Sequence, residues 1–98
     1  MDYDIPGGYE VIAVGDTPIG LTAAKIAGAG RETSIHMCVE NYNIRYTADG
    51  ATAPSATVGV LMVAGNEYTF SGRKILNNLS FHFVTSEASV KVQYFHGG

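Results

Sequence analysis

Hydrophobic and polar residues alternate with a period of two along most of the chain, the spacing of half-buried β-strands rather than of helices. Residues 89–95 are the cleanest example, with Val90, Val92 and Tyr94 on one face and Lys91 and Gln93 on the other. Further segments of this kind are residues 9–14, 34–40, 43–47, 68–70 and 79–85. With an apolar run at residues 57–63, the pattern predicts seven short strands.

Turn-forming residues separate these segments. Asp49-Gly50 suits a tight turn, and the loop that follows it leads into residues 57–63, which we expect to be covered on both faces. We expect residues 64–67 to form a hairpin loop, and Ser71-Gly72 and Asn77-Asn78 to break the chain further. Short strands between regular turns predict an all-β fold, either a small antiparallel β-sandwich or a jelly-roll-like barrel.

One stretch departs from this pattern. Residues 21–27 are rich in alanine and are long enough for a short helix of about two turns, although an irregular loop is equally compatible with them. The 98 residues suffice for one hydrophobic core. We therefore expect residues 1–7 to be an N-terminal arm and residues 8–96 to be a single β-sandwich domain.

Composition excludes several classes of protein. Charged residues make up only 15% of the chain and the net charge is -3, so no basic stripe for binding nucleic acid is present. The longest apolar run is about seven residues, far below the ~20 that span a bilayer, and the start of the chain lacks a signal-peptide pattern. Cys38 is the only cysteine, which excludes an intrachain disulfide. A small, weakly charged domain without disulfides favours a homo-oligomer.

Candidate chemistry is sparse. His36, Cys38 and Glu40 share a strand face, but neighbours on one face lie about 6.6–6.8 Å apart and do not easily converge on one metal. Cys38 with His36 or His82 could form a nucleophile and base, yet no local pattern for an orienting group or an oxyanion hole accompanies them. No phosphate-binding glycine loop is present. We therefore expect no catalytic residue, cofactor or metal, and a protein that is not an enzyme.

Aromatic and apolar residues in adjacent positions predict an interaction surface. Tyr94 and Phe95 cannot both point inward from a regular strand, and the same holds for Leu61 and Met62. Outward apolar groups indicate a face that a partner covers, here a protein in preference to sugars or bases. The candidate interface residues are Tyr3, Ile5, Tyr68 and Phe95.

Several segments in order resemble small structural proteins of tailed bacteriophages. These segments are residues 17–24 (TPIGLTAA), 39–40 (VE), 44–50 (IRYTADG), 53–59 (APSATVG) and 88–95 (ASVKVQYF). Together they cover most of residues 17–95. The resemblance implies a virion component with a β-sandwich core and carries over no catalytic residues.

The resemblance implies a capsid decoration or cement protein, assembled into the virion in the host cytoplasm. Such proteins bind the outside of the shell in many copies, as small oligomers among which a trimer is favoured. The expected partners are the major capsid protein or other virion proteins, with no nucleic acid and no membrane. A tail, fibre-base or head–tail adaptor component is the alternative, and a glycan- or receptor-binding module is a more distant one.

Overall fold

The computed structural model describes residues 5–26 and 33–96 of the chain. Their elements follow in the order β1 (Ile5–Val14), α1 (Ala23–Ile26), β2 (Thr33–Glu40), β3 (Ile44–Thr47), β4 (Val60–Met62), β5 (Glu67–Ser71), α2 (Arg73–Asn78), β6 (Ser80–Phe83) and β7 (Ala88–His96).

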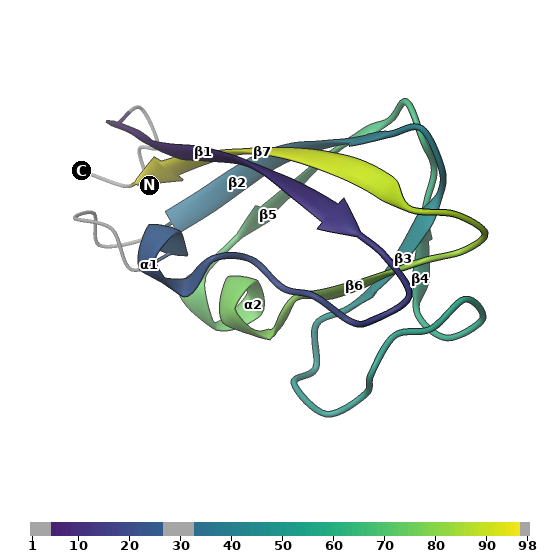
Figure 1. Ribbon diagram of the computed structural model, residues 1–98. Coiled ribbons are helices and arrows are strands. Elements are labelled where there is room, and N and C mark those ends of the chain that lie inside the picture. Colours follow the sequence, from purple (N-terminus) through teal and green to yellow (C-terminus); the bar gives the residue numbers. More distant parts are fainter. Residues whose placement is uncertain (1–4, 27–32, 97–98) are drawn as a thin grey trace.

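The strands form two sheets, and every strand pair is antiparallel. One sheet has four strands in the order β1-β7-β2-β5, and the other has three in the order β4-β3-β6. An isolated bridge between Ile19 and Phe81 brings the segment after β1 alongside β6. Figure 1 shows α1 and α2 side by side, at the end of the molecule where β1 begins and β7 ends.

The alternating pattern produces the strands that the sequence predicts most clearly. Val90, Val92 and Tyr94 of β7 are fully buried, whereas Lys91 between them is exposed. In β2 the residues Ile35, Met37 and Val39 are likewise fully buried, because successive side chains of a strand point to opposite faces. The predicted all-β class with a small antiparallel two-sheet body is confirmed.

The core fills the space between the two sheets. The three-stranded sheet contributes Ile44, Met62 and Phe81, all fully buried. Tyr46 of β3 meets Phe70 of β5 edge to face, with ring centroids 5.2 Å apart, and so joins the two sheets. Burying a large apolar side chain stabilises a fold by about 1.5–3 kcal/mol, so this core is the main source of stability.

Two short helices close one end of the core. The predicted short helix is present as α1, which buries Ile26. The helix α2 was not predicted, since residues 77–78 were expected to break the chain and instead complete its last turn. Leu76 is the buried residue of α2, and the helix begins after Gly72, whose φ of 97° is in the left-handed region that favours glycine.

Two predictions around β4 are wrong. Residues 64–67 do not close a hairpin, because they join β4 of one sheet to β5 of the other. The apolar run at residues 57–63 is not covered on both faces: only Val60–Met62 form a strand, and Val60 is 57% exposed. The strand lies at the edge of the three-stranded sheet, where no second layer reaches both of its faces.

β1 begins inside the segment that was expected to be an N-terminal arm, residues 1–7. β1 begins at Ile5, whose backbone faces His96 of β7, and a bulge between Pro6 and Tyr9 follows. Residues 5–7 therefore belong to the four-stranded sheet. Residues 1–4 of the arm lie outside the described residues.

Candidate functional site

The four candidate interface residues are dispersed. Tyr3 lies outside the described residues, and Ile5 opens β1. Phe95 is half-buried on the outer face of the four-stranded sheet, since its neighbours Tyr94 and His96 are buried on the inner face. Its outward direction agrees with the prediction, and its role in an interface remains a prediction.

Tyr68 does not point outward, which corrects the expectation. It faces the buried Met37 across the β2–β5 pair and packs against the core. Its hydroxyl oxygen accepts a hydrogen bond of 2.8 Å from the backbone N–H of Val63. Tyr68 therefore holds the β4–β5 connection in place and offers little to a partner.

The structure exposes apolar side chains at positions that the strand pattern did not single out. The large hydrophobic residues with the greatest exposure are Tyr9, Val11, Ile19, Tyr42, Val58, Val60, Leu61, Val63 and Ile75. Four of them lie in residues 56–66, a stretch without a charged residue that we call the β4 surface. Among these nine residues, the sequence indicated an outward position only for Leu61, because Leu61 and its neighbour Met62 cannot both point inward.

The β4 surface is held in shape by an arginine. Arg45 of β3 donates hydrogen bonds to the carbonyl oxygens of Ala56 and Gly59, at 3.1 and 3.0 Å. Gly59 has a φ of 120°, and a Cβ there would lie 2.8 Å from the carbonyl oxygen of Tyr46. The chain therefore approaches β3 closely just before β4, and only glycine fits at that position without strain.

The outer face of the four-stranded sheet carries two pairs of polar side chains away from β1. Lys91 pairs with Glu40 at 2.5 Å, and His36 contacts Glu67 and, at 3.3 Å, Thr69. The hydrogen bond with Glu40 raises the pKa of Lys91. Both pairs are solvent-exposed, where ion pairs add little stability.

A polar cluster closes the inner face near the start of β1. Glu10 accepts hydrogen bonds from the Tyr94 hydroxyl and, at 2.6 Å, from the Thr22 hydroxyl. Burial raises the pKa of Glu10, but these hydrogen bonds outweigh it and the net pKa is lowered. Burial raises the pKa of Tyr94, and the bond to Glu10 raises it further. The cluster therefore pairs a carboxylate with a protonated phenol and ties β1 to β7.

The residues considered for nucleophilic or metal chemistry have other partners. His82 directs Nδ1 at the carbonyl oxygen of Phe83 (2.6 Å) and Nε2 at that of Asp16 (3.1 Å), and it lies in the other sheet from Cys38. His36 shares a strand face with Cys38 but is directed at Glu67 and Thr69. No group of three or more metal-ligating residues occurs among the described residues.

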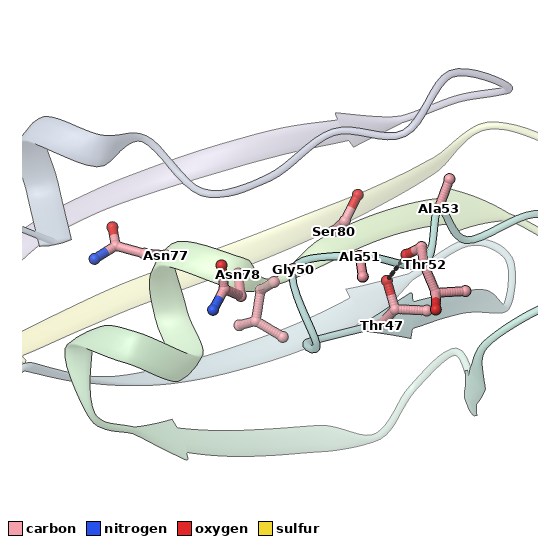
Figure 2. A pocket seen from close by; sticks show the side chains of 9 residues that line it. Thr47, Gly50, Ala51, Thr52, Ala53, Asn77, Asn78 and Ser80 are labelled. Atoms are coloured by element: carbon pink, nitrogen blue, oxygen red, sulfur yellow. Dashed lines mark hydrogen bonds between the residues drawn. The ribbon is translucent and has the colours of Figure 1, made fainter.

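An open cleft of about 350 Å³ lies between the β3–β4 loop and the end of α2. Its lining residues are Thr47, Gly50, Ala51, Thr52, Ala53, Asn77, Asn78, Leu79 and Ser80, as Figure 2 shows for eight labelled residues. Hydrogen bonds from the hydroxyl and N–H of Thr52 and from the N–H of Ala51 lower the pKa of Asp49 to about 2. The cleft wall carries neither a charged nor an aromatic side chain, so it has no general acid, base or stacking group.

These observations define a small two-sheet protein whose notable surface features are apolar strand edges. No helix among the described residues is long and apolar enough to cross a membrane. Comparison with protein-family models, with curated proteins and with solved structures finds no match.

Proposed function

We propose that the protein is a non-enzymatic structural component of a tailed-bacteriophage virion, a decoration protein that binds the capsid shell and reinforces it. The order of sequence segments that resemble such proteins supports this proposal. The two-sheet fold is compatible with it. The observation that carries it is the β4 surface, because an uncharged, apolar strand edge is suited to contact with another protein.

The partner we propose for the β4 surface is the major capsid protein. Val58, Val60, Leu61 and Val63 are each about half exposed. Complete burial of such side chains is worth about 1.5–3 kcal/mol each, so covering the exposed half of all four gives roughly 4 kcal/mol per copy. Association itself costs about 4–15 kcal/mol, so one such contact alone is weak.

Weak single contacts favour a protein that acts in many copies. When several copies are linked through the shell or through each other, each further contact forms at high effective concentration. Reinforcement then comes from apolar surface buried additively over the shell. We place the protein in the virion, after assembly in the host cytoplasm, as a small homo-oligomer.

Binding to purified shells that lack the protein tests the proposal. The chain is added to such shells, and the bound amount is measured by co-sedimentation. Leu61→Gln is expected to weaken binding about tenfold or more, since it removes apolar contact at the centre of the β4 surface. Ile75→Gln on α2 is the matched control, because Ile75 is 45% exposed and Leu61 43%.

The result also separates the alternatives. No binding to shells by the unchanged chain contradicts the proposal, and binding confined to tails or to the portal vertex supports the adaptor alternative instead. Equal binding of Leu61→Gln and Ile75→Gln contradicts the role of the β4 surface. Retention on a host-glycan array without shell binding supports the receptor-binding alternative.

A further inference from the structure

We propose that β1 is the contact edge of a twofold dimer, in which the β1 strands of two copies of this chain pair antiparallel about Val11. The contact is separate from the β4 surface and does not depend on the proposed function. It rests on the direction of backbone groups along β1, on the exposed side chains of this strand and on a groove at one end of it.

The strand pairing shows which backbone groups of β1 point off the sheet. In β2, the carbonyl oxygen of Thr33 accepts a hydrogen bond from the N–H of Gly72, and the backbone of Val39 bonds to Gly65 and Asn66. Both residues therefore direct their backbone groups toward the β5 side. Backbone groups alternate in direction along a strand, so the even-numbered residues of β2 bond to β7. Each of these even-numbered residues faces an odd-numbered residue of β7, as Cys38 faces Lys91, so the odd-numbered residues of β7 bond to β2.

The same alternation carries across β7 to β1. The even-numbered residues of β7 bond to β1, where Val92 faces Glu10 and Val90 faces Ile12. The backbone N–H and C=O groups of Tyr9, Val11 and Ala13 therefore point away from the sheet. No hydrogen bond to these groups is found among the described residues. A free edge of this kind is a template for another strand.

The side chains of the same three residues are exposed and fit a second copy. Tyr9 is 52% and Val11 53% exposed, and Ala13 is small and exposed. In an antiparallel pair about Val11, each Tyr9 faces Ala13 of the second copy, and Val11 faces its own counterpart. Large side chains then oppose small ones, and each of the three facing pairs exchanges two backbone hydrogen bonds.

A groove of about 260 Å³ lies where the second copy's tyrosine would be. Ala13 lines it, together with residues 15–19 and Glu87. Pro18 and Ile19 make part of its wall apolar, and Ile19 is exposed. The ring of Tyr9 from a second copy, placed opposite Ala13, would lie against this groove.

The two ends of β1 differ in charge, because acidic side chains lie at its end, whereas at its start Lys25 lies within electrostatic reach of the Glu10 carboxylate and lowers its pKa. Lys25 packs beside Gly8, near the start of the strand, where a Cβ would lie 3.0 Å from its Nζ. Asp16 and Glu87 line the groove at the end of the strand, and Glu87 lies beside Gly15. The proposed pairing sets residue 8 opposite residue 14 of the other copy, so the acidic end of each strand meets the Lys25–Glu10 pair, in which the two charges offset each other. Among the described residues, this register therefore does not set one acidic cluster against another.

The contact is small, and we expect a reversible dimer. Each copy offers three edge residues and one small groove, whereas a standard stable interface uses roughly 20–30 residues on each side. The symmetry is twofold, which differs from the trimer that the resemblance to decoration proteins favours.

Sedimentation velocity over a range of protein concentrations tests the dimer. The unchanged chain is expected to shift from monomer to dimer as concentration rises. Val11→Lys places like charges opposite each other at the twofold axis and should weaken the dimer about tenfold or more. Val60→Lys is the matched control on β4, at 57% exposure against 53% for Val11, and should dimerise as the unchanged chain does.

A cross-link tests the register in the same protein. Facing residues in a bonded antiparallel pair have Cα atoms about 5.5 Å apart, within the range of a disulfide. Val11→Cys in a Cys38→Ser background should therefore form a disulfide-linked dimer on mild oxidation, whereas Val60→Cys should not. A chain that stays monomeric at every concentration, a dimer unaffected by Val11→Lys, or cross-linking only through Val60→Cys would each overturn the proposal.

Discussion

Replacing Tyr94 with phenylalanine removes one hydrogen bond and leaves the ring in place. The Tyr94 hydroxyl donates to Glu10 from a fully buried side chain, while Thr22 still supplies two donors to the same carboxylate. Hydrogen bonds to charged groups are worth about 1.5–3 kcal/mol. We take the lower end, since Glu10 is partly solvent-exposed. Tyr94→Phe should therefore lower the free energy of unfolding by about 1.5 kcal/mol at pH 7.

This loss is large enough to measure. With an unfolding entropy of about 2.1 cal/mol/K per residue, a chain of 98 residues should melt roughly 7 °C lower. Urea denaturation supplies the free energy directly. Tyr46→Phe is the matched control, because the Tyr46 hydroxyl has no hydrogen bond among the described residues. It should change stability by less than about 0.5 kcal/mol.

The effect should also depend on pH. The pKa of Glu10 is lowered on folding from its ordinary value of 4.5, so the folded state is favoured above that value. This contribution is lost as the pH falls through the folded-state pKa. Tyr94→Phe removes one donor that lowers the pKa, so the variant should lose less stability on acidification than the unchanged chain. Equal losses for Tyr94→Phe and Tyr46→Phe at pH 7, or identical pH profiles of the variant and the unchanged chain, would refute this reasoning.

Three further changes test the description of the strands. Deleting residues 1–7 should lower the melting temperature, since it removes the start of β1 opposite His96, whereas deleting residues 1–4 spares every described strand; differential scanning calorimetry compares the two. Gly59→Ala should cost about 2–3 kcal/mol in urea denaturation, because its φ is 120° and its Cβ would meet the Tyr46 carbonyl; Gly65→Ala, with open space around its Cβ, should cost about 1 kcal/mol. Arg45→Met should speed proteolysis within residues 55–59, since it removes both hydrogen bonds that hold this loop; unchanged cleavage there would contradict that role.

Strands with a clean alternation could be predicted from the sequence, including which face is buried. In β2 and β7 every second residue is apolar, and burial of that face leaves one register that keeps it inside. The prediction of a hairpin at residues 64–67 was wrong because a glycine turn between two apolar runs fits a hairpin and a crossing between sheets equally well. Only packing decides between them, here through the bonds that the N–H of Gly65 donates to the carbonyl oxygen of Val39 and the N–H of Val39 donates to that of Asn66, which tie the loop to β2.

The surfaces were harder to anticipate than the strands. Tyr68 was expected to point outward, yet its position opposite the buried Met37 in the β2–β5 pair turns its side chain inward. Conversely, Val11 and Val60 belong to runs that look like core and are exposed. Val11 lies on the outer face of β1, opposite Lys91, and Val60 lies on β4 at a sheet edge. Edge position follows from strand order, which depends on long-range pairing that local sequence does not encode. The candidate surfaces could therefore be found only from the fold.

The location of the chain in intact virus particles tests the central proposal most directly. Electron cryomicroscopy of purified virions, with the chain identified by an attached label, gives both its position and its relative copy number. The account predicts many copies spread over the outer surface of the shell, with residues 56–66 against the major capsid protein. Particles without the chain, or with copies confined to a single vertex or to the tail, would contradict it.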